Sequence, residues 1–196
     1  MDDYKRICIT KDLNKKLIIK NPTNFVLIGQ GSQGAIFKLD NSKCIKIYES
    51  EKIAEQERNA YLKAFGSPIM PVLFETGNNY MIIEYIKGPN LKEYLLNTNG
   101  FTKEITLELI NMFYEMRRLN FQRKDESLRH ILLKDNRTIK IVDHVYAFTL
   151  KNPYPVKFFK QLGKIDRLDT FIRQGFELAP ELFEEFKIQM PEFFNM

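Results

Sequence analysis

Short alternating runs of apolar and polar residues dominate the first half of the chain, separated by Gly, Asn, Asp and Ser. Such alternation is the pattern of half-buried β-strands. A helical spacing of apolar residues behind a capping Ser50 predicts one helix, over residues 50–65. The strands that the alternation predicts cover residues 7–10, 17–19, 25–28, 35–39, 43–48, 72–76 and 79–85.

Helical spacing is the main pattern of the second half, with one hairpin inside it. Two strands, residues 131–133 and 138–142, flank the polar turn 134–137. The segment Lys87-Gly88-Pro89-Asn90 breaks the pattern between the halves, so we expect two domains, 1–86 and 87–196. The fold class is therefore α+β. The predicted helices of the second half cover residues 91–96, 102–119, 162–171 and 181–186.

Composition narrows the functional classes. The net charge of +5 is spread over 196 residues without a basic block, so we do not expect nucleic-acid binding. Cys8 and Cys44 form no CxxC pair, which favours a reducing compartment. No apolar run has the length of a signal peptide or membrane span. We therefore expect a cytoplasmic protein without membrane contact.

A glycine-rich loop, Gly29-Gln30-Gly31-Ser32-Gln33-Gly34, follows the strand at 25–28. In a dinucleotide fold a helix would follow this GxGxxG pattern. Here the next segment, 35–39, has strand alternation, so the loop is predicted to be a hairpin tip. Glycines at such a tip allow backbone N–H groups to approach phosphates closely.

Lys46 and Glu57 are the charged residues whose positions need an explanation. Alternation places Lys46 on the opposite face of its strand from Ile45 and Ile47. Glu57 lies in the middle of the apolar face of the predicted helix, and a buried carboxylate requires a cationic partner. We expect it to pair with Lys46. The alternatives are a solvated lysine and a glutamate at a wet edge of the helix.

Asp125 and Asp143 flank the hairpin of the second half. A tight hairpin brings these loop residues to the same end of a small sheet, where one carboxylate can orient a nucleophile and the other can hold a metal. Arg123 and Lys124 are expected to keep Asp125 ionised. The alternative is a pair of solvated loop aspartates.

The order of these parts, over residues 22–148, resembles the protein kinase superfamily, and in particular small bacterial serine/threonine-protein-kinase-like proteins. Glu57 matches the helix glutamate that pairs with the strand lysine, and Asp143 matches the first residue of DFG. The segment 123–130 corresponds to HRDxxxxN. The nucleotide-site positions of the family fall on Gly29, Gly31, Gly34, Ile36, Lys46, Ile83 and Glu84.

The resemblance implies a minimal two-lobed kinase-like fold, with an antiparallel sheet and one helix in the first lobe and a reduced helical second lobe. It implies ATP with a divalent metal, Mg²⁺ or Mn²⁺. Lys46, held by Glu57, would contact the phosphates, and Asp143 with His130 would hold the metal. Asp125 would orient the hydroxyl of a protein or small-molecule acceptor.

The chain departs from the family pattern at several positions. His130 replaces an asparagine, His144 replaces the phenylalanine of DFG, and Arg123 replaces the histidine of HRD. Only 53 residues follow Asp143, too few for a regular activation segment and a large helical lobe. Ala179-Pro180-Glu181 spells the family's APE, but we interpret Pro180 as a helix start. Three functions follow: a protein phosphotransferase, an inactive nucleotide-binding regulator, or a small-molecule kinase.

Overall fold

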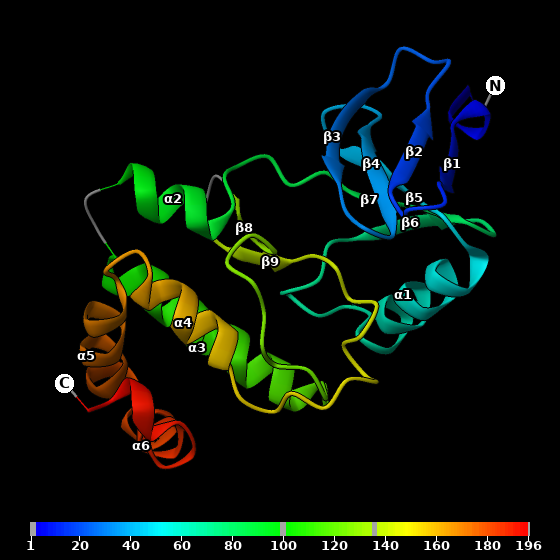
Figure 1. Ribbon diagram of the computed structural model, residues 1–196. Helices are drawn as coiled ribbons and strands as arrows, with labels where there is room; N and C mark the ends of the chain where they lie inside the picture. Colours follow the sequence, from blue (N-terminus) through cyan, green and yellow to red (C-terminus); the bar gives the residue numbers. More distant parts are fainter. Residues whose placement is uncertain (1–2, 99–100, 135–136, 196) are drawn as a thin grey trace. The chain divides into compact units, whose positions relative to one another are not determined.

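The computed structural model describes residues 3–98, 101–134 and 137–195 and divides the chain into two compact units. Unit 1 comprises Met1–Gly66 and Pro71–Ile86, and unit 2 comprises Ser67–Met70 and Lys87–Met196. Figure 1 labels the elements of both units. The assignment of residues 1–86 and 87–196 to two kinase lobes stays a prediction.

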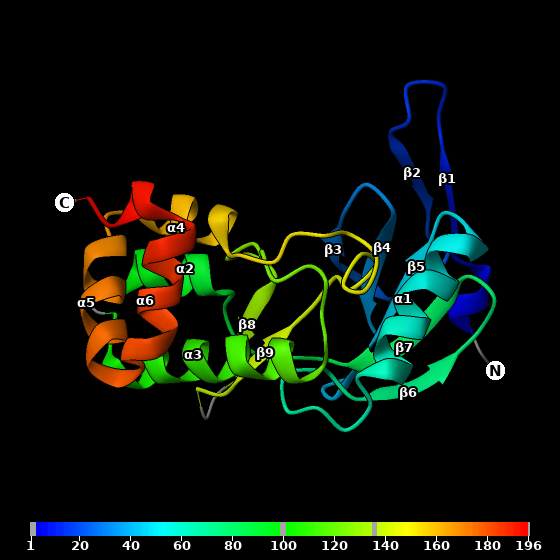
Figure 2. The ribbon, with the colours of Figure 1, turned by 90° about the horizontal axis from the view of Figure 1, so that it is seen from below.

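Unit 1 is built on a five-stranded antiparallel sheet of order β3-β4-β5-β7-β6. One helix, α1 (Glu51–Lys63), packs on β5 and β7 of this sheet (Figure 2). The strands are β3 (Val26–Gln30), β4 (Gly34–Lys38), β5 (Lys43–Tyr48), β6 (Leu73–Thr76) and β7 (Tyr80–Glu84).

The N-terminal segment packs on the sheet through a cluster of buried residues. It consists of the 3₁₀ helix η1 (Asp3–Arg6) and the antiparallel hairpin β1 (Cys8–Lys11) and β2 (Leu17–Lys20). Ile7 and Ile9 of this segment share a buried cluster with side chains of β4, β5 and β7. The residues of β4 and β5 in this cluster, Ala35, Phe37, Ile45 and Ile47, alternate along their strands with Ile36 and Lys46. Because Lys46 faces α1, the N-terminal segment and α1 contact opposite faces of the sheet.

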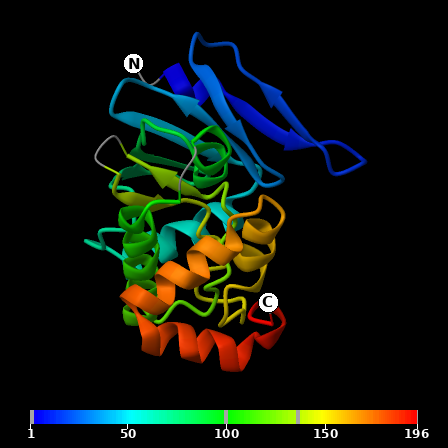
Figure 3. The ribbon, with the colours of Figure 1, turned by 90° about the vertical axis from the view of Figure 1, so that its left-hand side faces the viewer.

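Unit 2 is mainly helical, with an aromatic core. Its helix α5 packs on α3, α4 and α6 (Figure 3). Six phenylalanines of this core are buried to 2% exposure or less, Phe113, Phe158, Phe159, Phe171, Phe183 and Phe186. The elements are α2 (Leu91–Asn97), α3 (Lys103–Arg118), α4 (Val156–Gly163), α5 (Leu168–Leu178), α6 (Pro180–Gln189), η2 (Pro191–Phe193), and the antiparallel hairpin β8 (Ile131–Leu133) with β9 (Ile139–Ile141).

The mixed α+β class is confirmed, because helices accompany antiparallel sheets in the described residues. The helix predicted over 162–171 is wrong. Helix α4 ends at Gly163, a poor helix former, and Asp166 adopts a left-handed φ of 54° before α5 begins. Pro180 occupies the first turn of α6, as expected. Asp135 and Asn136 of the predicted turn 134–137 lie outside the described residues.

The described helices include none with both the length and the apolar character needed to cross a membrane.

Candidate functional site

In unit 1, a row of residues across the sheet brings together four of the predicted nucleotide-site positions. Gly29 of β3 is opposite Ile36 of β4, and Ile36 is opposite Lys46 of β5. Lys46 is in turn opposite Met81 of β7, and Ile83 lies two positions further along that strand. Because directly opposite residues share a sheet face, the side chains of Ile36, Lys46 and Ile83 project to one side.

The expected pairing of Lys46 with Glu57 is confirmed. Lys46 Nζ lies 2.5 Å from Glu57 Oε2, and the two side chains are only 12% and 1% exposed. The Lys46 ammonium also lies 5.2 Å from the centre of the Tyr48 ring. Glu57 lies on the face of α1 that buries Ala54 and Ala60. Its burial excludes the alternative of a wet-edge glutamate.

The glycine-rich loop spans the end of β3 and the start of β4, with the Gly31 N–H bonded to the Gly34 carbonyl at 3.0 Å. The three glycines meet different surroundings. A Cβ at Gly31 would have no neighbour within 4 Å, whereas one at Gly34 would lie 2.3 Å from the Ile47 carbonyl oxygen. Gly34 is therefore required for packing of β4 on β5, and Gly31 has open space beside it.

Glu84, at the end of β7, forms hydrogen bonds with Val72, the residue before the edge strand β6. Its Oε2 accepts a hydrogen bond of 3.2 Å from the Val72 N–H, and its own N–H donates to the Val72 carbonyl at 2.8 Å. Its backbone carbonyl lies 3.7 Å from Cys44 Sγ. The neighbouring Ile83 is buried, with 4% exposure.

In unit 2, His130 lies between two carboxylates. Its Nδ1 is 3.6 Å from Glu126 Oε2 and 3.8 Å from Asp143 Oδ2. The hairpin causes this proximity, because His130 directly precedes β8 and the Val142 N–H donates to the His130 carbonyl at 2.9 Å. Asp143 then has a left-handed φ of 72°. The buried Glu126 also accepts a hydrogen bond of 3.3 Å from Arg123 Nη2.

The predicted metal ligands are thus close neighbours, one nitrogen and one carboxylate. Within the described ranges, no three or more His, Cys, Asp or Glu side chains form a cluster that could hold a metal by themselves. A pair of protein ligands fits an ion whose remaining positions are filled by water and nucleotide phosphates, which is the usual arrangement for Mg²⁺. Asp143 could supply the carboxylate for such an ion, and the His130 nitrogen, 3.8 Å from Asp143 Oδ2, would suit a softer divalent ion than Mg²⁺.

Asp125 is placed differently from the expectation. Its Oδ1 accepts hydrogen bonds from the backbone N–H groups of Lys157, at 2.7 Å, and Phe158, at 3.2 Å, in the first turn of α4. The expectation that Arg123 and Lys124 favour the ionised form of Asp125 is not supported, because the pKa of this carboxyl is raised overall. Burial raises the pKa of the Asp125 carboxyl, and the two N–H groups and the Lys157 ammonium only partly oppose this. Arg123 is instead paired with Glu126.

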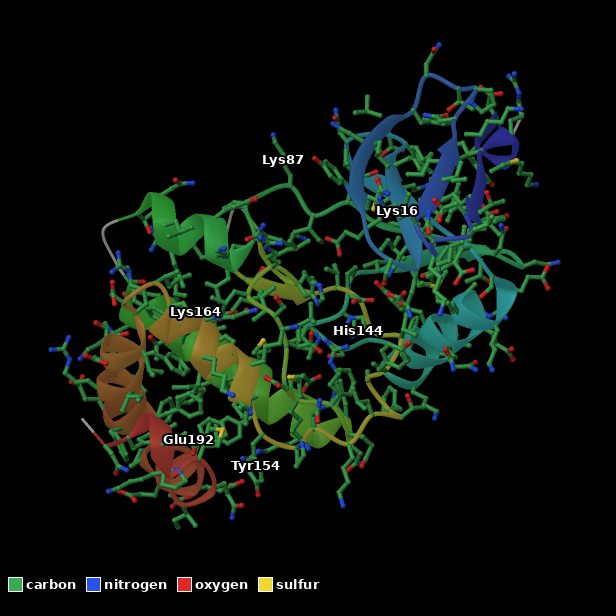
Figure 4. All side chains as sticks on the ribbon, viewed as in Figure 1. Lys16, Lys87, His144, Tyr154, Lys164 and Glu192 are labelled. Carbon is green, nitrogen blue, oxygen red and sulfur yellow. The ribbon has the colours of Figure 1, made fainter. Side chains whose placement is uncertain are left out.

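His144, labelled in Figure 4, is a buried residue of unit 2. Its side chain has no exposed surface, and its Nε2 lies 2.8 Å from the Ile141 carbonyl oxygen. The ring contacts Phe121 edge to face, with the centroids 5.9 Å apart. His144 therefore packs in the core at the position where the family pattern has phenylalanine.

Two residues beside the site were missed by the sequence reasoning. Glu126 has a sequence signal, because it stands three residues after Arg123 and four before His130. Gln161 of α4 has none. Its Oε1 accepts a hydrogen bond of 2.8 Å from the Leu128 N–H, a contact between residues far apart in the sequence.

Similarity to known proteins supports a kinase-like relation. The chain is 25% identical over 122 residues to the "Putative serine/threonine-protein kinase YrzF" of Bacillus subtilis, covering 60% of this chain and 57% of that protein. It is 23% identical over 165 residues to the "Probable serine/threonine-protein kinase fnkB" of Dictyostelium discoideum, covering 80% of this chain and 30% of that protein. No family model matches. The chain therefore spans less than two thirds of each of these relatives.

Proposed function

We propose that this chain is a kinase-like phosphotransferase that moves the γ-phosphate of ATP to a hydroxyl group. The observation that carries the proposal is the buried Lys46–Glu57 pair. Lys46 lies opposite Ile36 of β4, the strand that follows the glycine loop. A buried ion pair is costly to maintain for stability alone. Both relatives are named as serine/threonine-protein kinases, which supports the same function.

Unit 1 would bind the nucleotide. The backbone N–H groups around Gly29, Gly31 and Gly34 would cover the phosphates, where a side chain at Gly31 would intrude. Lys46 would contact the α- and β-phosphates, with Glu57 fixing its ammonium in place. The apolar side chains of Ile36 and Ile83, with the end of β7 at Glu84, would line the base.

Unit 2 would supply the groups for transfer. Asp143 and His130 would hold the divalent ion, which neutralises charge that develops on the phosphates. Asp125 would accept a hydrogen bond from the acceptor hydroxyl through Oδ2, since its Oδ1 accepts from the α4 backbone. We propose a serine or threonine of a protein as acceptor. A hydroxyl of a small molecule is the alternative acceptor.

A second function is a nucleotide-binding regulator without phosphotransfer. It is favoured by the engagement of Asp125 as a cap of α4, because a residue with this structural role can be retained without catalysis. In that case Lys46 and Glu57 would still bind the nucleotide.

Thermal stabilisation by ATP with Mg²⁺ tests the binding part of the proposal. We expect Lys46→Met and Asp143→Asn to lose most of the stabilisation that the wild-type protein shows. Lys43→Met is the matched control, because Lys43 lies on the same strand but on the other face. Stabilisation that is unchanged in both site variants would contradict the nucleotide assignment.

A further inference from the structure

Helix α4 holds the segment 125–128 at two points. At its N-terminal end, the N–H groups of Lys157 and Phe158 donate to Asp125 Oδ1. One turn later, Gln161 Oε1 accepts the Leu128 N–H at 2.8 Å and lies 3.3 Å from Ser127 Oγ. Tyr154 and Lys164, labelled in Figure 4, stand shortly before and directly after this helix.

The two contact points lie at the N-terminal end of α4 and one turn further along the helix. Residues four apart in a helix are stacked about one turn, or roughly 5.4 Å, along its axis. Lys157 and Gln161 have this spacing, so a rigid element spans the segment from Asp125 to Leu128. Helix α4 is in turn fixed by Phe158 and Phe159, which are completely buried in the aromatic core.

Loss of the hydrogen bond to Gln161 would be costly because its donor, the Leu128 N–H, is buried. Leu128 has no exposed surface, and Ser127 is only 5% exposed. A buried N–H that loses its acceptor costs more than an average hydrogen bond contributes, so the segment would have to rearrange. Gln161 therefore determines where the Leu128 backbone lies.

The same segment connects Asp125 to the predicted metal ligands. The Ser127 carbonyl accepts the His130 N–H at 2.8 Å, and His130 Nδ1 lies 3.8 Å from Asp143 Oδ2. A displacement of residues 127 and 128 would thus change the distance between Asp125 and this pair. Phosphoryl transfer depends mainly on the relative positions of such groups.

We propose that Gln161 is a positioning residue for phosphoryl transfer, which fixes Asp125 relative to His130 and Asp143 by holding the Leu128 backbone from α4. This inference rests on the proposed phosphotransferase function. It adds a residue of α4 to the site and assigns it no contact with the nucleotide or the acceptor. Gln161 therefore acts on the rate of transfer and leaves nucleotide affinity unchanged.

The experiment compares Gln161→Leu, which removes the acceptor oxygen, with Gln161→Glu, which keeps one. Lys160→Met is the control, because Lys160 is an exposed neighbour on the same helix. We expect kcat to fall about 10- to 100-fold in Gln161→Leu, the scale of small misplacements of reacting groups, while KM for ATP stays within about twofold. Gln161→Glu should recover most of kcat.

Amide hydrogen exchange reports the contact independently of activity. The Leu128 N–H should exchange faster in Gln161→Leu than in the wild type. The Ile141 N–H, which donates to the Ile69 carbonyl at 2.8 Å in the same unit, should be unaffected and serves as the internal reference. Faster exchange at both amides would show general loosening of unit 2 and would overturn the specific role of Gln161.

The outcomes separate this inference from the function on which it rests. An active wild type with unchanged kcat in Gln161→Leu overturns the positioning role and leaves the phosphotransferase in place. An equal loss of kcat in Gln161→Leu and Gln161→Glu also overturns it, because the acceptor oxygen would then be irrelevant. Absence of transfer in the wild type overturns the proposed function and this inference together.

Discussion

Lys46 Nζ lies 2.5 Å from Glu57 Oε2 in a pair that is almost fully buried. This ion pair connects strand β5, which carries Lys46, to helix α1, which carries Glu57. Two ions removed from water require excellent geometry to remain stable, and replacing such a pair with apolar side chains is often neutral. The retention of both charges in unit 1 is consistent with a role in binding an anionic ligand.

The first prediction concerns the stability contributed by this pair. Lys46→Met removes the ammonium from beside a buried carboxylate, so we expect unit 1 to lose about 3 kcal/mol of unfolding free energy. The double variant Lys46→Met/Glu57→Leu should recover much of this loss, because no charge stays buried. Denaturant titration measures both values. A double variant that is less stable than the single one would contradict this account.

The second prediction separates packing from ligand binding in the glycine loop. A side chain at Gly34 would collide with the Ile47 carbonyl oxygen, so Gly34→Ala should lower the melting temperature. Gly31→Ala meets no neighbour and should leave the melting temperature unchanged while weakening ATP binding. Unchanged ATP affinity in Gly31→Ala would argue against phosphate contact at the loop.

The third prediction concerns pH. In the proposed mechanism transfer requires ionised Asp125. Burial raises the pKa of this carboxyl, so activity should fall on acidification at a higher pH than for an unperturbed aspartate of pKa about 3.9. Lys157→Met removes a charge that lowers this pKa, and it keeps the backbone N–H that bonds Asp125. The acidic limb of the kcat/KM profile should therefore move to higher pH.

Lys160→Met, an exposed substitution on the same helix, is the control for the pH profile and should leave the limb in place. A limb that moves to lower pH in Lys157→Met would contradict the assignment to Asp125.

The raised pKa of Asp125 also has a consequence for the stability of the fold. A carboxyl that binds its proton more tightly in the folded state loses its stabilising effect as the pH rises through its folded pKa.

The strands of unit 1 could be predicted because their residues alternate, and the predicted boundaries of β5 agree with the structure. The pairing of Lys46 with Glu57 could be predicted as well, since a carboxylate in an apolar stripe demands a cation. The contact of Asp125 with α4 could not. It depends on where helix α4 begins, since Lys157 in its first turn is 32 positions from Asp125, and the residue before the helix provides no side-chain cap.

A charged residue within an apolar pattern was thus easier to infer than a contact that depends on the path of a loop. Glu126 and His130 are four positions apart in the sequence but do not lie in a helix. Their contact depends on the hairpin that follows His130 and on the pairing of Glu126 with Arg123. The break between α4 and α5 was missed because the apolar positions continue through it. A left-handed Asp166 interrupts the helix there without the glycine that usually marks such a turn.

The fourth prediction concerns the metal. His130 offers nitrogen where an asparagine would offer oxygen, and imidazole prefers softer ions than Mg²⁺. The ratio of ATP affinity with Mn²⁺ to that with Mg²⁺ should therefore be higher in the wild type than in His130→Asn. Calorimetric titration of ATP in each metal measures this ratio. Equal ratios in the two proteins would show that His130 does not bind the ion.

The central claim is that Asp125 acts in phosphoryl transfer, and Asp125→Asn tests it most directly. The amide keeps a carbonyl oxygen that can accept the Lys157 and Phe158 N–H groups, so the cap of α4 is preserved while the carboxylate is lost. The measurement is transfer of labelled γ-phosphate from ATP to protein and small-molecule hydroxyl acceptors, with ATP affinity determined in parallel. We predict that transfer falls about 10²-fold or more while ATP affinity is maintained. Wild-type transfer that survives unchanged in Asp125→Asn would contradict the claim.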